Sequence, residues 1–287
     1  MCVGNTDRVL LDGPLRTERL AVNLLLWRAA HLGPAVAVTM MVGLLCVAVD
    51  LDPYRTALVV AAVLTGQLSI GWSNDLLDLA RDRRAGRTDK PLATGGLSPG
   101  PVRTACRVAV YATLVLSLVL GWLPGGLQLL SVAAGWAYNV RLKVTVWSWL
   151  PYAVAFGALA TVPSLALPEL DVAWWLPVVG ALLGVGAHLV NVLPDLDDDA
   201  ATGVAGLPHR LAARFGRRSV TPAAVALFVA ATVLLLGVPG FRGPLVWVAG
   251  ALVGALVVVA LVGRGRTPFR AAMAIALVDV VMLTVVL

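Results

Sequence analysis

Residues 74–90 read NDLLDLARDRRAGRTDK and follow directly on the apolar segment 55–74, so a row of acidic and basic side chains stands where an apolar helix ends. Residues four positions apart are neighbours on a helix, with about 5–6 Å between their Cβ atoms. Asn74, Asp78 and Asp82 therefore form one polar stripe over two turns. Such a stripe predicts a polar site at one end of a helical bundle.

A second acidic stretch repeats this spacing, since residues 191–203 read NVLPDLDDDAATG. The two stretches match at four positions, which pair Asn74 with Asn191, Asp78 with Asp195, Asp82 with Asp199, and Gly86 with Gly203. Repeats of this kind are typical of duplicated membrane bundles. We therefore expect two stripes that face each other across a bundle, whereas Asp197 and Asp198 lie off the stripe and are expected in solvent.

The composition of the chain places both stretches in a membrane protein. Hydrophobic residues make up 59% of the 287 residues and charged residues 13%, with a mean hydropathy of +0.88. A soluble domain carries about 25% charged residues, so these values exclude a soluble enzyme, a disordered protein and a disulfide scaffold. The continuous apolar runs argue against a β-barrel. The net charge of +6 indicates basic loops held against anionic membrane lipid rather than a nucleic-acid partner.

Nine apolar segments are long enough to cross a bilayer, at about 31–49, 55–74, 104–122, 124–140, 147–166, 173–192, 221–238, 244–262 and 269–287. With the N-terminus inside, 20 of the 22 Lys and Arg residues fall on the inner side, and only Arg55 and Arg242 fall outside. A miscounted span would reverse every later loop and destroy this asymmetry. The sequence therefore predicts an all-α polytopic membrane protein, with nine transmembrane helices in one bundle, the N-terminus inside and the C-terminus outside.

This count also fixes the expected domain organisation. Residues 1–21 are interpreted as a polar tail rather than a signal peptide, and residues 22–287 as a single nine-helix transmembrane domain. Both acidic motifs then lie on the cytoplasmic side of the cell membrane. The three cysteines (Cys2, Cys46 and Cys106) lack the spacing of a disulfide framework or a metal site, and we expect them to be unpaired.

The residue types in the two stripes indicate which ligand they bind. Carboxylate and amide oxygens are the ligands that Mg²⁺ accepts, together with water and substrate phosphates. The stripes contain no thiol, which argues against zinc. The expected metal ligands are Asn74, Asp78, Asp82, Asn191, Asp195 and Asp199. The alternative, helix-end charges that merely face water, is disfavoured because a carboxylate near an apolar span is costly and this spacing occurs twice.

At these residues the sequence resembles the UbiA superfamily of intramembrane prenyltransferases. That family carries an N-D-x-x-D-x-x-x-D motif, which matches residues 74–82, and a following R-T-x-x-R-P-L-x-x-G segment, which is similar to residues 87–95. Its second D-x-x-x-D motif matches Asp195 and Asp199. Residues 138–143 (YNVRLK) are similar to its Tyr/Lys segment, and Leu26-Trp27-Arg28 to its entry into the first helix.

The resemblance implies a Mg²⁺-dependent enzyme that moves an isoprenyl group from a prenyl diphosphate to an aromatic or other lipophilic acceptor and releases diphosphate. Asp78, Asp195, Lys143 and Tyr138 are the expected catalytic residues. The expected diphosphate-binding residues are Asn74, Arg87, Lys90, Lys143, Tyr138, Asn191 and Arg28. For Lys143 and Arg28 the alternative is anchoring at the inner membrane surface.

Three departures from the family pattern concern the geometry of the site. Lys90 stands where the family usually has Arg, which keeps the charge and loses the bidentate fork. Val192 stands where many members have a second Asp. Pro194 lies within the second stripe, where it is expected to kink the end of the helix.

Other functions remain open on the sequence alone. An intramembrane terpene cyclase would keep the fold and need no acceptor. Prenyl transfer to a phosphosugar or phosphorylated lipid would need further basic residues in the pocket. A cation-coupled transporter, the non-enzyme alternative, would place its carboxylates nearer the membrane midplane.

Two further residues near the motifs carry alternatives of their own. Trp72 is either a π-face that shields a carbocation or a packing residue, and His188 is either a base or a buried core residue.

Overall fold

The computed structural model describes residues 22–167, 172–196, 204–238 and 244–287, and within these ranges it contains helices and no strand. The predicted polar tail at 1–21 lies outside these ranges. A short helix, Val22–Ala29, comes first. The helices that follow are α2 (Leu32–Ala48), α3 (Pro53–Arg84), α4 (Pro99–Leu120), α5 (Trp122–Val140), α6 (Leu150–Leu165), α7 (Trp175–Val192), α9 (Leu207–Phe215), α10 (Val220–Leu236), α11 (Pro244–Val262) and α12 (Thr267–Val286). Four 3₁₀ turns complete the described structure: η1 (Leu142–Val144), η2 (Val146–Trp149), η3 (Leu193–Asp195) and η4 (Arg217–Ser219).

Each of the nine predicted apolar segments lies on one of these helices. Within the described ranges, seven helices are long and apolar enough to cross a membrane: α3, α4, α6 with η2, α7, α10 with η4, α11 and α12. The Val22–Ala29 helix and α2, bent by 65° at the break between them, make an eighth candidate if they count as one span. The chain is therefore a multi-pass helical membrane protein, and α5 is the predicted segment that does not meet this test.

The helix α3 carries the first motif and is the longest in the described structure, with 32 residues. It begins where the Asp52 carboxylate accepts hydrogen bonds from the backbone N–H groups of Tyr54 and Arg55, with Pro53 at its first position. It ends at Arg84, just before Gly86, which has a φ of +66°. The sequence predicted that the apolar segment stops at residue 74, but the helix continues for almost three further turns and so carries the whole motif.

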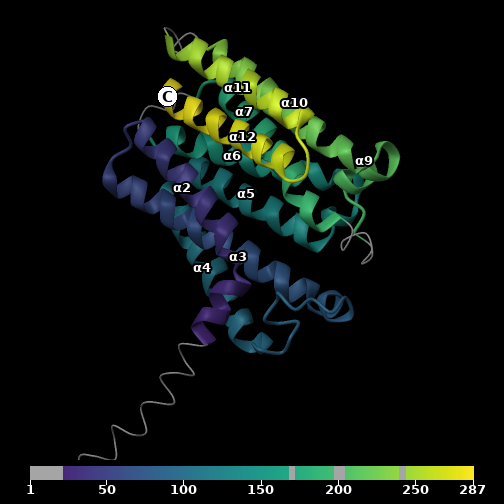
Figure 1. Cartoon of the computed structure of the whole chain (residues 1–287). Helices are drawn as coiled ribbons and strands as arrows, with labels where there is room; N and C mark the ends of the chain where they lie inside the picture. The colour runs from purple at the N-terminus through teal and green to yellow at the C-terminus, as the bar shows by residue number, and fades with distance from the viewer. Residues whose placement is uncertain (1–21, 168–171, 197–203, 239–243) are drawn as a thin grey trace, which may run out of the picture.

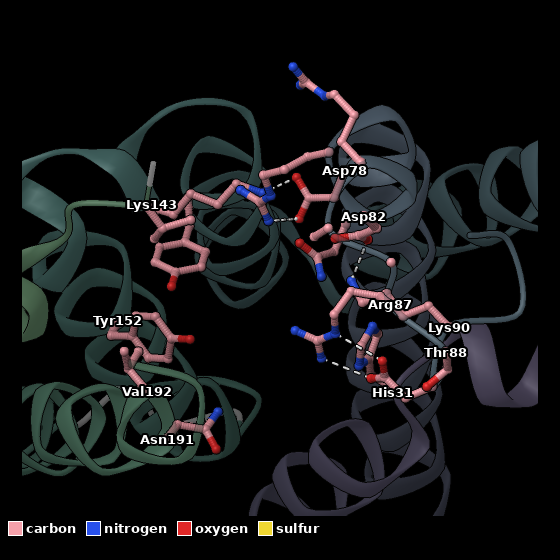
Figure 2. A pocket seen from close by; sticks show the side chains of 18 residues that line it. His31, Asp78, Asp82, Arg87, Thr88, Lys90, Lys143, Tyr152, Asn191 and Val192 are labelled. Atoms are coloured by element: carbon pink, nitrogen blue, oxygen red, sulfur yellow. Dashed lines mark hydrogen bonds and ion pairs between the residues drawn. The ribbon is translucent and has the colours of Figure 1, made fainter. Parts of the chain in front are cut away.

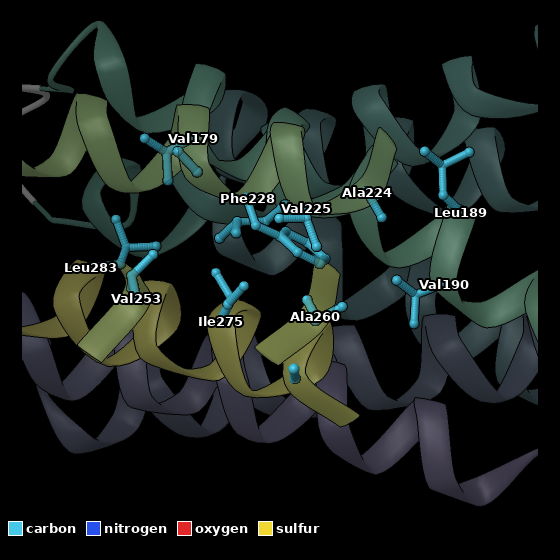
Figure 3. Packing of buried hydrophobic residues seen from close by; sticks show 14 of the residues in the cluster. Val179, Leu189, Val190, Ala224, Val225, Phe228, Val253, Ala260, Ile275 and Leu283 are labelled. Carbon is cyan, nitrogen blue, oxygen red and sulfur yellow. The ribbon is translucent and has the colours of Figure 1, made fainter. Parts of the chain in front are cut away.

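The helices are arranged so that neighbours along the chain pack together (Figure 1). The helices α10, α11 and α12 pack with α7 on one side of the bundle, α2, α3 and α4 lie on the other, and α12 also contacts α2. Figure 3 shows the larger apolar cluster, which includes Phe228 of α10, Ile275 of α12 and Val179 of α7. This packing leaves the ends of α3, α5 and α7 free to form a polar site.

The break between the first helix and α2 is fixed against α3 by a close backbone approach. A Cβ atom added at Gly71 would lie 2.1 Å from the carbonyl oxygen of Ala30, so only glycine fits there. Trp72 is buried, and its Nε1–H donates a 3.0 Å hydrogen bond to the carbonyl of Leu26. His31 follows in the left-handed region with a φ of 53°. The chain therefore turns at residues 30–31 in a position that places His31 beside α3.

Cys46 and Cys106 are both buried and unpaired, as predicted. Trp72 belongs to an apolar cluster and does not line the cavity described below, so the packing alternative holds for this residue.

Candidate functional site

A polar cavity of about 990 Å³ lies where the C-terminal part of α3 faces the ends of α5, α6 and α7 (Figure 2). Eight of the residues predicted from the sequence line it together: Asn74, Asp78, Asp82, Arg87, Lys90, Tyr138, Lys143 and Asn191. They come from α3, from the loop after it, from α5 with η1, and from α7. The fold therefore brings the two halves of the predicted site to one cavity.

The Asp78 carboxylate is buried and holds two cations. Lys143 Nζ donates to its Oδ1 at 2.5 Å, and Arg81 Nη2 donates to its Oδ2 at 2.7 Å. Lys143 lies in η1, directly after α5, so this ion pair ties α5 to α3. Burial of the Lys143 ammonium lowers its pKa below the usual value, in spite of the hydrogen bond to Asp78.

A second ion-pair group lies beside the first. Lys90 Nζ lies 2.9 Å from Asp82 Oδ2 and 3.1 Å from Asp75 Oδ1. Burial works against the charge of Lys90, but the attraction of Asp75 and Asp82 outweighs it, so the pKa of Lys90 lies above its usual value. Asp75 Oδ1 also lies 2.8 Å from Nε2 of His31. The side chains of Asp82, Lys90, Asp75 and His31 thus form a continuous chain of contacts.

The loop after α3 holds Arg87 at the rim of the cavity. Its Nε and Nη2 atoms donate to both carboxylate oxygens of Asp89, at 2.9 and 2.8 Å. These hydrogen bonds hold the pKa of Asp89 at about 2, below its usual value. Arg81 and Arg84 line the same cavity. Arginine, lysine and carboxylate side chains are therefore all presented to one space.

The wall opposite α3 is formed by aromatic and amide side chains. The Tyr138 and Tyr152 rings meet edge to face with 5.2 Å between their centroids, and both line the cavity with Asn191. Figure 2 shows Tyr152 and Asn191 across the cavity from Asp82 and Arg87. A Cβ atom added at Gly184 of α7 would lie 2.6 Å from the Tyr152 carbonyl oxygen. This glycine lets α6 and α7 approach closely enough to place Tyr152 beside Asn191.

His188 lies behind this wall and does not line the cavity. It is buried, stacks on Tyr152 at 4.4 Å between ring centroids, and its Nε2 lies 3.0 Å from Ser148 Oγ. Ser148 Oγ also accepts a 2.8 Å hydrogen bond from the backbone N–H of Leu207. Of the two alternatives for His188, a base or a buried core residue, its position favours the second. Through Ser148 it links η2, α7 and the start of α9.

The second motif is built differently from the first. The helix α7 ends at Val192, and Leu193–Asp195 form a 3₁₀ turn with Pro194 at its centre. The predicted disturbance of the helix end at Pro194 is therefore found, because proline has no N–H to donate to an α-helix. The regular α-helical spacing expected for the second stripe does not extend past Val192. The side chain of Asp195 and all of Asp197, Asp198 and Asp199 lie outside the described residues.

Arg28 is placed differently from the other predicted diphosphate-binding residues. It is exposed on the helix Val22–Ala29 and does not line the cavity.

The sequence reasoning missed several residues of this site, among them His31, Asp75, Arg81 and Tyr152. Asp75 belongs to the quoted motif but lies one position off the stripe, and it is only 1% exposed. A charged residue within an apolar helix was the signal for it, since such a residue needs a buried partner. His31 and Tyr152 carried no motif, and their roles depend on the turn at residues 30–31 and on the approach of α6 to α7.

A buried group of carboxylates and cations at one end of an apolar helical bundle is typical of an integral membrane protein with a functional polar site. Residues 35–282 match the model of the UbiA prenyltransferase family, and the chain belongs to that family. This confirms the resemblance seen in the motifs. A search of curated proteins finds no match.

Solved structures of the same fold agree with this assignment. A UbiA homolog from Archaeoglobus fulgidus, bound to GPP and Mg²⁺, has a TM-score of 0.69 at 14% identity, with 91% of this chain and 98% of that chain covered. The apo UbiA homolog from Aeropyrum pernix K1 has a TM-score of 0.67 at 18% identity, covering 86% and 96%. A structure described as digeranylgeranylglyceryl phosphate synthase has a TM-score of 0.64 at 16% identity, covering 91% and 96%. At these identities the similarity concerns the fold.

Proposed function

We propose that this chain is a Mg²⁺-dependent intramembrane prenyltransferase. It would take an isoprenyl group from a prenyl diphosphate, transfer it to an aromatic or other lipophilic acceptor, and release diphosphate. The observation that carries this proposal is the cavity itself, where the buried carboxylates Asp78 and Asp82 lie beside Lys143, Arg87 and Lys90. The GPP and Mg²⁺ bound to the Archaeoglobus fulgidus homolog support it.

The donor atoms in the cavity fit a magnesium ion. The described lining residues offer hard oxygens, from the carboxylates of Asp78 and Asp82 and the amides of Asn74 and Asn191, and no thiol. Together with Asp195 and Asp199, these residues would hold the metal. Bound there, Mg²⁺ would neutralise the diphosphate leaving group as a Lewis acid.

The chain's own cations would bind the diphosphate directly. Lys143 and Arg87 line the cavity and present charged N–H donors, which form short, strong bonds to phosphate oxygens. Lys90 adds a third cation, and the Tyr138 hydroxyl a neutral donor. Arg28 lies outside the cavity, and its exposed position favours the anchoring alternative.

The reaction needs no covalent intermediate with the protein. The bond between the allylic C1 and the diphosphate oxygen breaks, and both electrons leave with the diphosphate. The acceptor then forms a bond to C1 and loses a proton. The aromatic side chains of Tyr138 and Tyr152 line the same space, and aromatic rings stabilise positive charge. The apolar exterior of the bundle suits a donor whose tail is soluble in lipid.

The activity is tested with the purified full chain, Mg²⁺, radiolabelled prenyl diphosphates of increasing length and a panel of aromatic acceptors. We expect labelled diphosphate to be released and the acceptor to be prenylated, and both to stop in EDTA. A hydrocarbon product formed from donor alone would instead identify a terpene cyclase. The absence of diphosphate release with every donor would contradict the proposal.

We further propose that the bundle spans the cell membrane nine times, with the N-terminus and both motifs on the cytoplasmic side. The distribution of basic residues supports this orientation. In a background without native cysteines, Cys at Ala85 or Arg210 should react with an impermeant thiol reagent only from inside. Cys at Tyr54, at the opposite end of α3, should react only from outside. Labelling of Ala85 and Arg210 from opposite sides would reject this topology.

A further inference from the structure

The described carboxylates of the first motif are all paired with cations of the protein. Asp78 holds Lys143 and Arg81 through separate oxygens, at 2.5 and 2.7 Å. Lys90 bridges Asp82 and Asp75 at 2.9 and 3.1 Å. These contacts are buried, since the side chains of Lys143, Asp78 and Asp82 are all less than 10% exposed. A metal ion at these oxygens would therefore have to replace an ammonium group.

The charges within this cluster balance. The three carboxylates Asp75, Asp78 and Asp82 are matched by three cations, which are Arg81, Lys90 and Lys143. A bare divalent cation meets no net negative charge in this group. In the same ranges of the chain, no three side chains among His, Cys, Asp and Glu are arranged as a metal site.

We propose that the first motif is closed to free divalent cations and admits its metal only together with a diphosphate. The inference rests on the proposed function and adds the order of binding at the same site. The diphosphate oxygens give the two lysines new partners, so Lys143 leaves Asp78 Oδ1 and Lys90 leaves Asp82 Oδ2. Both oxygens then become available as metal ligands, and the ligand that enters is a metal–diphosphate complex.

After each lysine has moved, Asp78 and Asp75 each keep another partner. Asp78 retains Arg81 at Oδ2, and Asp75 retains His31 at 2.8 Å. The exchange therefore does not leave a carboxylate of Asp75 or Asp78 without a partner. Both lysines already line the cavity, so a rotation of the side chain suffices to turn them toward a ligand.

The residue type at position 90 fits this role. Lysine is a compact charge on a flexible four-carbon stem, whereas arginine holds a carboxylate with a planar fork. The lysine bridges Asp75 and Asp82 through one nitrogen, and a single nitrogen exchanges partners more readily than two parallel hydrogen bonds.

The test measures binding of Mn²⁺, a spectroscopic substitute for Mg²⁺, to the full chain in lipid nanodiscs by electron paramagnetic resonance. Titrations are made with and without inorganic pyrophosphate. The wild-type chain should bind free Mn²⁺ weakly, and pyrophosphate should increase the amount bound to the protein. Lys143→Met and Lys90→Met should each bind free Mn²⁺ about tenfold more tightly than the wild type, which corresponds to about 1.4 kcal/mol. Because Mn²⁺ and pyrophosphate binding are linked through the two lysines, pyrophosphate should increase the Mn²⁺ affinity of these variants less than that of the wild type.

Two matched variants separate partner exchange from the general loss of a positive charge. Arg84 lines the same cavity, and its Nε donates to the Ala80 carbonyl rather than to a motif carboxylate. Arg84→Met should therefore change free Mn²⁺ binding by less than about threefold, a difference below 1 kcal/mol. Lys143→Arg keeps the cation on Asp78 and should bind free Mn²⁺ as weakly as the wild type.

The possible results separate the inference from the proposed function. Equal affinity of the wild type and both lysine variants for free Mn²⁺ would overturn the inference and leave the prenyltransferase proposal intact. An equally large gain in Arg84→Met would overturn it too, because the effect would then be one of net charge. If no variant binds Mn²⁺ even with pyrophosphate, the metal–diphosphate site itself is absent and both proposals fail.

Discussion

Replacing Asp78 by Asn should lower both the stability and the activity of this protein, and a second substitution at Lys143 should separate the two effects. The substitution keeps the size of the side chain and removes the charge that holds Lys143 and Arg81. The buried Lys143 ammonium is then left facing a neutral amide. Arg81 is 22% exposed and can be covered by water, so the penalty falls mainly on Lys143, which is 9% exposed.

The magnitude follows from the burial of this pair. Removal of one partner of a buried ion pair costs about 3–5 kcal/mol, because the other charge stays buried without a partner. The partial exposure of Arg81 places Asp78→Asn near the lower end, at about 3 kcal/mol of unfolding free energy. Turnover should fall at least about 100-fold, the usual effect of removing one group that stabilises charge in the transition state.

The assay is a double-mutant cycle with Asp78→Asn, Lys143→Met and the double variant. The free energy of unfolding is measured in mixed micelles, and turnover with a labelled prenyl diphosphate. The double variant should regain most of the lost stability, because the buried Lys143 charge is gone and the Arg81 guanidinium that remains is partly exposed to water. Its turnover should stay at the level of Asp78→Asn. Asp89→Asn serves as the control for stability alone, since its 59% exposed side chain pairs with Arg87 where water can replace the lost charge.

Two results would refute this reasoning. If the double variant regains turnover, then Asp78 serves only to neutralise Lys143 and is not part of the reaction. If Asp78→Asn is as stable as the wild type, Lys143 does not depend on this carboxylate for a partner.

Three further predictions concern other parts of the structure. In a turnover assay, Asp195→Ala should lose activity, whereas Asp198→Ala should keep most of it. An equal loss in both variants would show that the alignment of Asp78 with Asp195 is wrong. Gly184→Leu should separate α6 from α7, because even a Cβ atom there would lie 2.6 Å from the Tyr152 carbonyl oxygen. The expected loss of unfolding free energy, about 1–3 kcal/mol, is measured by thermal unfolding. Gly254→Leu is the unaffected control, because no atom lies within 4 Å of a Cβ atom added there. Asp279→Asn should leave turnover within about twofold, a change under 0.5 kcal/mol. Asp279 is buried between α10 and α12, where Thr232 Oγ1 donates to it at 2.6 Å, and it does not line the cavity. A strong loss of turnover would assign this buried pair a part in the reaction.

The first half of the site follows from the sequence because its geometry is local. Asn74, Asp78 and Asp82 share one face of a regular helix, and the i, i+4 spacing alone places them together. Tyr138 and Lys143 were predicted from their resemblance to the family's Tyr/Lys segment. Tyr138 lies near the end of α5 and Lys143 in η1 directly after it, so both line the same cavity.

The rest of the site depends on contacts between distant parts of the chain. His31 reaches Asp75 only because Gly71 lets the chain turn at Ala30, and no spacing rule connects residues 31 and 75. In the second motif, the helical period was applied across Pro194, where the backbone changes to a 3₁₀ turn. The pairing of Lys90 with two carboxylates likewise depends on the fold of the loop after α3, so its partners were not evident from composition or spacing.

The central claim is that the carboxylate motifs and the cations of this cavity bind one metal–diphosphate complex. It is tested most directly by a structure of the full chain with Mn²⁺ and a thiolo analogue of dimethylallyl diphosphate that cannot ionise, with the metal located by its anomalous scattering. We predict Mn²⁺ on Asp78 and Asp82 and the diphosphate in contact with Lys143 and Arg87, with Asn191 on the opposite side. A metal bound elsewhere, or a diphosphate that lies outside the cavity while Lys143 stays on Asp78, would contradict the claim.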